Sequence, residues 1–406
     1  MKILFICASY SPRSASPAFR TTHISKALEN LGKEIFVLTY DEAFQTRLDK
    51  YDDILKKNEV KNVQRINQPI PQGKSKNLFI KNLFYKYGLG SLLIPDPHIK
   101  NINKFFYKAK EIVINNKIDL VITFSFPHSF HLIGYKLNKA LKIKWIADYG
   151  DIWYGAPHAE FNKNFIFKKI DFYLEKKILK NAFAVSLTTK PSIDFYKKHF
   201  SIKNYLLTEM GHVEEKKKQI EISKANNKIV FLHAGRLYHP LRDPLKMVNF
   251  IEKNNSILKA KLILVGEMDE YLKNKFNFLR PKETELLSWM STVELKGYFN
   301  KADVLVLFGN QSELQVPGKL YEYLNLRKPI LYLHMDLNND PVLELTKKFN
   351  YVFPVSNNKL DEELISVIDK INIMLEQNIT SNYNEEFTWN SIVNRMLLQI
   401  KTIDEN

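Results

Sequence analysis

The chain has 406 residues, of which 45% are hydrophobic and 26% charged, and its formal net charge at pH 7 is +16. This composition is that of a globular protein without internal repeats or low-complexity segments, and the length favours two domains of similar size. The single cysteine, Cys7, excludes an internal disulfide and fits a reducing compartment, so we expect a cytoplasmic protein. No apolar run approaches the roughly 18 residues that a membrane span needs.

The positive charge leaves two explanations open. Nucleic acid, anionic lipid and acidic substrates are all partners that such a charge would attract. The chain is also rich in lysine, asparagine and isoleucine throughout, as AT-rich genomes tend to produce, and composition alone could then explain the charge.

Apolar runs typical of buried strands alternate with amphipathic segments along the first half of the chain. The opening, "MKILFICASY", lacks the cleavage site of a signal peptide, so its apolar run is expected to form the first buried strand. Continuous apolar strands separated by helices indicate a parallel sheet that is covered on both faces. The strands are expected at 2–8, 34–40, 118–125, 143–148 and 182–189, and the helices at 19–32, 129–142 and 191–200.

A polar, charged segment at 208–228 has no clear apolar period and marks a domain boundary, after which a second series of strands and helices begins. We therefore expect an acceptor-binding domain at 1–212, a nucleotide-sugar-binding domain at 213–385, and a C-terminal helix at 386–406 that packs back on the first domain. The fold class is α/β, with two Rossmann-like, doubly wound parallel sheets facing a cleft. Ligands of such sheets bind beyond the carboxyl ends of the strands.

Cations and glycines follow the predicted strands of the second half. In "VPGKLYEYLNLRKPIL", residues 316–331, a short helix begins with a Pro-Gly turn. A helix start offers N–H groups and a positive dipole end, which suit a phosphate; nearby cations could neutralise a diphosphate without a metal, and a carboxylate could bind a ribose diol. The candidate donor-binding residues are Gly235, Arg236, Arg242, Gly266, Pro317, Gly318, Lys319 and Glu322.

The chain resembles retaining family 4 glycosyltransferases of the GT-B fold over nearly its whole length, most weakly at 45–110 and in the linker. In the second half, "HAGRLYHPLRDP", "ADVLVLFG", "VPGKLYEYLNLRKPIL" and "FTWNSIVNRM" are similar to the donor domain and C-terminal helix of that family. In the first half, the opening 41 residues and "SFPHSFHLIGYKLNKALKIKWIADYGDIW" are similar to its acceptor domain.

The resemblance implies roles for individual donor-side residues. Arg236 would bind the donor diphosphate, and Arg242 would take the place of the family's usual lysine. Glu322 would bind the ribose as the second glutamate of the Glu-x₇-Glu motif. The sequence departs from the motif at its first glutamate, where Leu314 stands, with Glu313 one residue away. The contact to the transferred sugar is therefore left open.

Two simpler interpretations of the donor residues remain. Lys319 and Glu322 could form a surface ion pair at i,i+3 spacing, worth a few tenths of a kcal/mol. The segment at Arg242 could cap the following helix through Asp243.

In the first half, candidate catalytic residues follow two predicted strands. Asp148 ends one strand, with Asp151 three residues on, and His128 follows the strand at 118–125. A carboxylate at a strand end could accept the proton of an acceptor hydroxyl or stabilise positive charge on the sugar ring. Alternatively, Asp148 caps a loop, and Asp151 pairs with a nearby cation. His128 and His131 do not predict a metal pair, because no third ligand is placed.

Residues 74–110 carry eight lysines and one acidic residue, Asp96, with apolar and aromatic residues between them. A basic helix with aromatics on its other face is typical of docking on an anionic membrane surface. The alternative is the solvated face of ordinary helices. Nucleic acid is less favoured, because no binding motif accompanies the charge.

The sequence thus predicts a cytoplasmic glycosyltransferase, and a peripheral position on the inner face of the plasma membrane is the alternative that its basic segment leaves open. It would move a sugar, with retention, from a nucleotide-sugar donor to an acceptor hydroxyl in lipid-linked surface polysaccharide synthesis. A UDP-sugar is favoured as donor, with no cofactor or metal. The rivals are a sugar-nucleotide epimerase of the same fold and a non-enzymatic basic binding protein. The sequence does not name the donor sugar, base, acceptor, linkage or oligomeric state.

Overall fold

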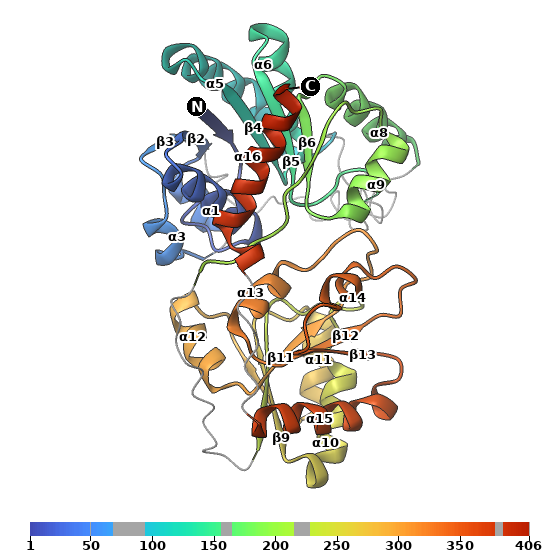
Figure 1. The fold of residues 1–406 in the computed structure, drawn as a ribbon. Helices are drawn as coiled ribbons and strands as arrows, with labels where there is room; N and C mark the ends of the chain where they lie inside the picture. Colours follow the sequence, from blue (N-terminus) through green and yellow to red (C-terminus); the bar gives the residue numbers. More distant parts are fainter. Residues whose placement is uncertain (49, 68–93, 156–164, 215–227, 378–384, 406) are drawn as a thin grey trace, which may run out of the picture. The chain divides into compact units, whose positions relative to one another are not determined.

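A computed structural model describes residues 1–48, 50–67, 94–155, 165–214, 228–377 and 385–405. The chain divides into two compact units (Figure 1). Unit 1 comprises Met1–Gly211 and Phe387–Asn406, and unit 2 comprises His212–Glu386. Each is described by itself below.

Unit 1 is built on a seven-stranded parallel sheet in the order β3-β2-β1-β4-β5-β6-β7. Its central strands are buried along nearly their whole length, as a sheet covered on both faces requires. The strands are β1 (Lys2–Ile6), β2 (Glu34–Tyr40), β3 (Asn62–Ile66), β4 (Leu120–Ser125), β5 (Lys144–Tyr149), β6 (Ala184–Leu187) and β7 (Tyr205–Leu207).

The helices of unit 1 begin and end at recognisable signals. The first has a proline in its first turn and is followed by Gly32 at φ 73°, a left-handed conformation that glycine adopts without strain. Another begins with a reciprocal capping box of Thr189 and Ser192. The helices are α1 (Ser16–Asn30), α2 (Glu42–Leu48), α3 (Asp53–Lys57), α5 (Ile102–Asn116), α6 (His131–Leu141), α8 (Phe165–Leu179), α9 (Lys190–His199) and α16 (Trp389–Glu405).

Helix α16 packs on α1 and β7 of unit 1, although more than 170 residues separate it from the rest of that unit. Its apolar face joins the core that the first strands form, through Trp389, Ile392, Val393, Met396 and Ile400. Gln399 donates to the carbonyl of Leu207 and accepts from its N–H, and Arg395 pairs with Glu209 at 3.1 Å. The helix therefore completes the core of unit 1.

Unit 2 holds a six-stranded parallel sheet in the order β10-β9-β8-β11-β12-β13. The predicted class, two doubly wound parallel-sheet units, is confirmed. The strands are β8 (Ile229–Ala234), β9 (Ala260–Val265), β10 (Thr284–Leu287), β11 (Val304–Phe308), β12 (Ile330–His334) and β13 (Val352–Ser356). The helices are α10 (Leu245–Leu258), α11 (Glu270–Leu279), α12 (Thr292–Lys301), α13 (Gly318–Leu326), α14 (Pro341–Thr346) and α15 (Leu360–Glu376).

In both sheets the strand order reverses beside the first strand of the unit, between β1 and β4 and between β8 and β11. Connections on the two sides of such a point run to opposite faces of the sheet, which opens space at the carboxyl ends of the strands. These two places are where ligand-binding residues are expected.

Candidate functional site: the strand ends of unit 2 and a charge cluster in unit 1

In unit 2, the strand ends of β8 and β9 bring Gly235 and Gly266 into backbone contact. The N–H of Gly235 donates to the carbonyl of Val265 at 2.9 Å. Gly266 has φ +140°, and a Cβ built on it would lie 2.2 Å from the carbonyl oxygen of Gly235. Only glycine fits at position 266, because any side chain would collide with backbone that cannot retreat.

The two predicted arginines lie on the loop after β8, in different surroundings. Arg236 is mostly exposed and pairs with Glu267, at the end of β9, at 3.0 Å. Arg242 donates from Nε to Asn310 Oδ1 at 3.2 Å, and its guanidinium lies 5.4 Å from the ring centre of Tyr238. Arg242 is thus held by two neighbours near the end of β11, whereas the Arg236 pair is exposed to solvent.

Helix α13 follows β11 and presents Lys319 and Glu322 on its partly exposed face. Pro317 is the N-cap, and no side chain caps this helix start. Lys319 Nζ lies 2.5 Å from Glu322 Oε2, so the ion pair that the spacing allows is present. The opposite face is buried, and the Tyr323 hydroxyl accepts a hydrogen bond from the N–H of Ala234 at 3.0 Å. This bond fixes α13 against the end of β8.

A buried histidine that was not predicted, His233, lies among these residues. Its Nδ1 donates to the carbonyl of Val306 at 2.9 Å, and its Nε2 has no hydrogen-bond partner among the described residues. A Cβ built on Gly235 would lie 3.2 Å from Nε2. Burial, together with the charges of Arg242 and Lys319, lowers the pKa of His233 to about 3. The imidazole is therefore neutral, with the Nε2 lone pair turned toward the Gly235 loop.

Arg242 and Lys319 both lie near His233, since the positive charge of each lowers the pKa of this buried ring. The sequence signal that could have found it is a histidine one residue before the end of a buried strand, directly ahead of Ala-Gly-Arg. A buried polar side chain at such a position needs a hydrogen-bond partner, whereas an apolar side chain does not.

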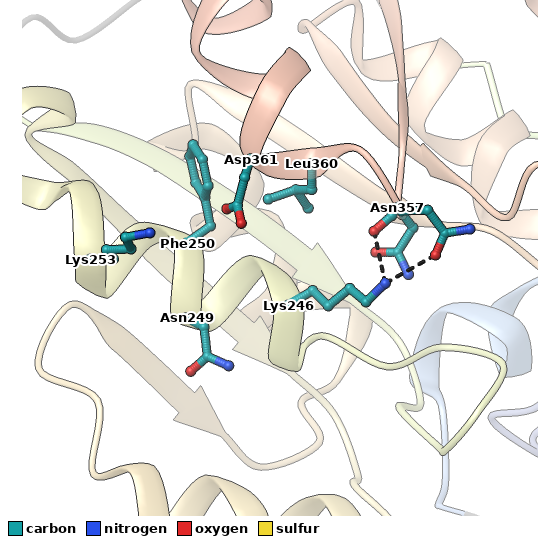
Figure 2. Close-up of a pocket in the computed structure, with 8 residues that line it drawn as sticks. Lys246, Asn249, Phe250, Lys253, Asn357, Leu360 and Asp361 are labelled. Atoms are coloured by element: carbon teal, nitrogen blue, oxygen red, sulfur yellow. Dashed lines mark hydrogen bonds between the residues drawn. The ribbon is translucent and has the colours of Figure 1, made fainter.

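A pocket of about 280 Å³ lies between the start of α10 and the connection from β13 to α15 (Figure 2). Lys246 Nζ donates to Asn357 O and Asn358 Oδ1 across it, each at 3.1 Å. None of the predicted donor-binding residues lines it. We therefore do not place the nucleotide there.

In unit 1, Asp148 is fully buried in a network that the sequence did not predict. Arg20, on α1, donates to its two carboxylate oxygens at 2.9 and 2.8 Å, and the Ser186 hydroxyl donates to Oδ2 at 2.6 Å. Arg20 also donates to the carbonyls of Thr208 and Glu209, each at 2.9 Å. Asp148 therefore does not present an open carboxylate at the strand end, and its surroundings are those of a structural ion pair.

The other two catalytic candidates lie near the ends of the same strands. Asp151 is exposed, and its carbonyl accepts from the Ser125 hydroxyl at 3.1 Å. His128 is buried and stacks on Trp153, with ring centres 5.3 Å apart and an interplanar angle of 7°. The structure brings His128 and Asp151 to the ends of the adjacent strands β4 and β5, which pair in parallel.

His131 is a buried core residue that is hydrogen-bonded at Nδ1, while its Nε2 has no partner among the described residues. The Thr123 hydroxyl accepts from the Trp145 indole N–H at 2.8 Å and is hydrogen-bonded to His131 Nδ1, also at 2.8 Å. Burial lowers the pKa of His131 to about 3, so the ring is neutral. Within the residues described, no three His, Cys, Asp or Glu side chains gather in a way that could hold a metal ion.

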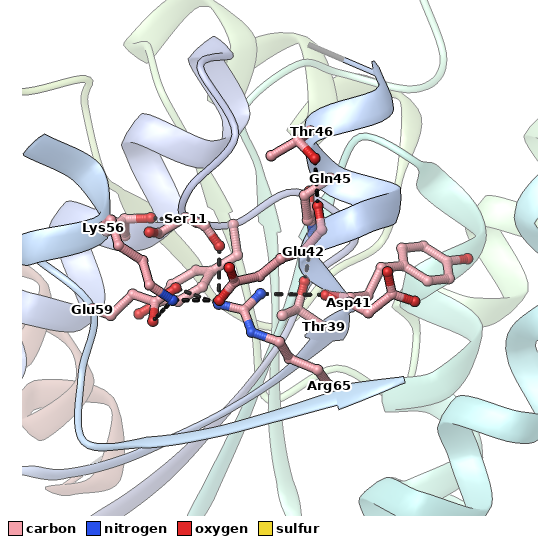
Figure 3. Close-up of polar contacts among 12 residues, drawn as sticks. Ser11, Thr39, Asp41, Glu42, Gln45, Thr46, Lys56, Glu59 and Arg65 are labelled. Atoms are coloured by element: carbon pink, nitrogen blue, oxygen red, sulfur yellow. Dashed lines mark hydrogen bonds and ion pairs between the residues drawn. The ribbon is translucent and has the colours of Figure 1, made fainter. Parts of the chain in front are cut away.

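A second network that the sequence did not predict surrounds Arg65 (Figure 3). Arg65 donates to the carbonyl of Ser11 at 3.2 Å and pairs with Glu59 and Glu42, and Lys56 bridges the same two glutamates. The loop after β1 is also held by a bond from the N–H of Asp52 to the carbonyl of Pro12 at 2.8 Å. These contacts hold the loop after β1, which lies in the segment that resembles the opening of the family's acceptor domain.

The expected membrane segment, 74–110, falls partly outside the described residues, which resume at 94. Within the described part, Phe105 is fully buried against Tyr40, so its apolar character serves the core. No helix in the described ranges has the length and hydropathy to cross a bilayer.

No protein-family model and no curated protein sequence matches the chain. Solved structures do match, at full length. They include sucrose-phosphate synthase from Thermosynechococcus elongatus, with 12% identity, a TM-score of 0.65 and 100% of both chains covered. HepE of Anabaena, in complex with UDP and glucose, has 15% identity and a TM-score of 0.62, over 100% of this chain and 97% of that one.

A third match is UDP-GlcNAc 2-epimerase from Methanocaldococcus jannaschii, with 14% identity, a TM-score of 0.56 and 99% of both chains covered. The two sheets and these likenesses define the fold as GT-B, which glycosyltransferases and UDP-GlcNAc 2-epimerases share. At such identities the comparison establishes the fold and not the reaction.

Proposed function

We propose that this chain is a retaining glycosyltransferase that moves a sugar from a nucleotide-sugar donor to an acceptor hydroxyl. We favour a UDP-sugar as the donor. A lipid-linked glycan for a surface polysaccharide is the acceptor class we favour. Unit 2 would bind the donor, and unit 1 would supply the groups that act on the acceptor. No cofactor or metal is part of the proposal.

The observation that carries the proposal is that Arg242 and Lys319 both lie near the buried His233, beside the uncapped start of α13. Two cations and a set of backbone N–H groups at the switch point of a parallel sheet suit a diphosphate. The contact between Gly235 and Gly266 keeps side chains out of the same strand ends, which would let a phosphate approach the backbone closely.

The cations of two exposed ion pairs in unit 2 can exchange their carboxylate partners for a diphosphate. In the unliganded chain, Lys319 is paired with Glu322, and Arg236 is paired with Glu267. Such partly exposed pairs stabilise a fold by about 0–1 kcal/mol, so opening them costs little. A diphosphate would then take the two cations, and Glu322 would be free to accept hydrogen bonds from the ribose hydroxyls. The cations accelerate transfer only if they bind the departing diphosphate more tightly than the intact donor.

On the acceptor side, we now favour His128 and Asp151 over Asp148. An acid or base must reach the proton that it transfers, and Asp148 already uses both oxygens on Arg20 and Ser186. Asp151 is exposed at the end of β5, and His128 lies at the end of β4.

A panel of UDP-, GDP- and ADP-sugars tests donor binding by thermal shift. We expect one nucleotide to raise the melting temperature, and Arg242→Gln to abolish that rise. Arg280→Gln is the matched control, because it removes an exposed arginine at the end of α11. If no nucleotide binds, or if both variants respond like the wild type, the proposed donor site is wrong.

An epimerase is the second candidate, because the M. jannaschii 2-epimerase shares the fold. Incubation of the bound nucleotide-sugar without any acceptor separates the two reactions. An epimerase would convert the donor into a new nucleotide-sugar, whereas a glycosyltransferase would leave it intact or hydrolyse it slowly. Formation of a new nucleotide-sugar would overturn the transferase proposal while leaving the donor site in place.

A further inference from the structure

Helix α8 of unit 1 presents one continuous face to solvent. Its exposed residues, followed by Lys180, recur at 165, 166, 169, 170, 173, 176, 177 and 180. At 3.6 residues per turn, these positions fall within an arc of about 140°. The helix lies at one flank of the unit beside α9 (Figure 1).

Four of the eight residues on this outward face are large apolar residues, although the face is open to water. Large apolar side chains are among the residues most often buried in folded proteins. Here four of them stand on this one face with their surfaces open: Phe165 is 69% exposed, Ile166 64%, Ile170 42% and Tyr173 66%.

The other half of the face is entirely cationic. Its remaining residues are Lys169, Lys176, Lys177 and Lys180, all exposed. The ammonium group of Lys169 lies 4.3 Å from the ring centre of Phe165, so charge and apolar surface are interleaved. The two carboxylates of α8, Asp171 and Glu175, are both buried on the inner face. No negative charge therefore remains on the outward side of residues 165–180.

Helix α15 of unit 2 shows that this pattern is not general to the chain. It also exposes two isoleucines, Ile365 and Ile373. Between and beside them stand the exposed carboxylates of Asp361, Glu362, Asp369 and Glu376. An anionic surface would repel that face, whereas it would attract the face of α8. The lysine-rich face of α8 is therefore a local feature and not only a result of the chain's overall lysine content.

We propose that the outward face of α8 docks on an anionic lipid bilayer, with Phe165, Ile166, Ile170 and Tyr173 entering the headgroup region and the lysines contacting lipid phosphates. A helix that exposes large apolar side chains together with lysines is suited to lie in the plane of a membrane interface. Anionic lipid is favoured over nucleic acid because half of the face is apolar, and phosphate contacts would not require that. The inference does not depend on the donor chemistry of unit 2.

Sedimentation of the full chain with lipid vesicles tests this. We expect binding to vesicles of phosphatidylcholine and phosphatidylglycerol in equal parts, weak binding to phosphatidylcholine alone, and loss of binding in high salt. Lys176→Glu with Lys177→Glu should lower the partition coefficient by at least about thirtyfold, since each lysine near anionic lipid contributes about 1 kcal/mol. The matched control is Lys57→Glu with Lys61→Glu. It makes the same charge change at exposed positions before β3, the strand at the far edge of the sheet from β6 and β7, and should bind like the wild type.

A second pair of variants tests the apolar contribution. Ile170→Ser with Tyr173→Ser keeps the charge and should weaken vesicle binding about tenfold or more, because buried apolar surface is lost. To test whether the helix enters the bilayer, Ile166→Cys can be labelled selectively, since the only native cysteine, Cys7, is buried. An environment-sensitive label there should shift to the blue on anionic vesicles, and the same label at Lys57→Cys should not.

Four results would overturn the proposal. The wild type could fail to bind anionic vesicles, or the α8 variants could bind as tightly as the wild type. If the apolar variants bind normally and the lysine variants instead lose binding to polyuridylate, the face is a nucleic-acid surface. If the wild type is a dimer in solution and the apolar variants are monomers that still ignore vesicles, a second copy of the chain covers the face.

Discussion

The two units each hold an ion pair near a switch point, and the pairs differ in almost every physical respect. In unit 1, the Arg20 and Asp148 side chains are 2% and 1% exposed, and both carboxylate oxygens are bonded. In unit 2, the Lys319 and Glu322 side chains are 33% and 40% exposed and are joined by one contact. A buried pair that loses one partner leaves an uncompensated charge, whereas an exposed pair can exchange partners with water or a ligand. The first arrangement is suited to holding the fold, and the second to binding.

The sharpest test of this contrast is Asp148→Asn. Removing one charge of a buried, hydrogen-bonded pair should lower the free energy of unfolding by about 3–5 kcal/mol, because Arg20 stays buried without its counter-charge. Urea denaturation measures the change. Asp151→Asn, at an exposed site three residues on, is the control and should leave stability nearly unchanged. A stable Asp148→Asn chain that has lost only turnover would restore the catalytic role for Asp148.

A buried carboxylate that accepts its hydrogen bonds from neutral groups extends the comparison. Glu175 accepts from the Tyr196 hydroxyl at 2.7 Å and from the N–H of Tyr154 at 3.0 Å, and burial raises its pKa from 4.5 to about 8. The folded state therefore holds more protons than the unfolded state between about pH 4.5 and 8. The contribution of Glu175 to stability is complete below this window and falls as pH rises through it, by at most about 1.4 kcal/mol per pH unit.

Glu175→Gln should remove this contribution to the pH dependence. The stability of the wild type relative to the variant should fall between pH 5 and pH 8, as followed by urea denaturation at several pH values. Glu111→Gln, on the exposed face of α5, is the matched control and should track the wild type. A Glu175→Gln chain with the wild-type pH profile would show that this carboxyl titrates normally.

Glu322→Ala tests the exposed pair. Donor affinity should weaken by roughly 1–3 kcal/mol, through lost charge-assisted hydrogen bonds to the ribose, with almost no change in melting temperature. Titration calorimetry with UDP measures the affinity. Glu344→Ala removes the glutamate of another i,i+3 pair, with Lys347, and should affect neither quantity. Normal affinity together with a lower melting temperature would make the Lys319–Glu322 pair purely structural.

The smallest expected effect is that of a chelator. Because cationic side chains are proposed to neutralise the diphosphate, UDP affinity should be the same with and without EDTA. A loss of more than about tenfold, or 1.4 kcal/mol, would mean that a divalent cation shares the task.

Sequence reasoning reached the fold because apolar runs and amphipathic segments are local patterns. It also placed Gly235, Arg242 and Lys319 at strand and helix ends that the chain does form. It could not predict the partner of Asp148, because Arg20 lies 128 residues earlier and sits among helix residues that offer no signal of burial. A strand-end aspartate looks the same in the sequence whether it faces solvent or a buried arginine.

His233 and Arg65 were missed for related reasons. A histidine inside an apolar run could be a packed core residue, and what distinguishes this one, the approach of its Nε2 to the Gly235 loop, exists only in the folded unit. Arg65 gains its meaning from Glu42, Glu59 and the carbonyl of Ser11, which come together only once β1, β2 and β3 have paired. Contacts made by tertiary pairing leave no periodic signal along the chain.

The place of α16 in the core of unit 1 has a consequence for how the protein is made. During translation, residues 1–211 leave the ribosome first, and the whole of unit 2 follows before Trp389, Ile392 and Val393 are available. Until then the apolar surface that α16 covers stays open, although unit 2 has all of its own residues and can already fold. The nascent unit 1 is therefore the one that needs protection from aggregation, and its folding finishes after that of the unit encoded behind it.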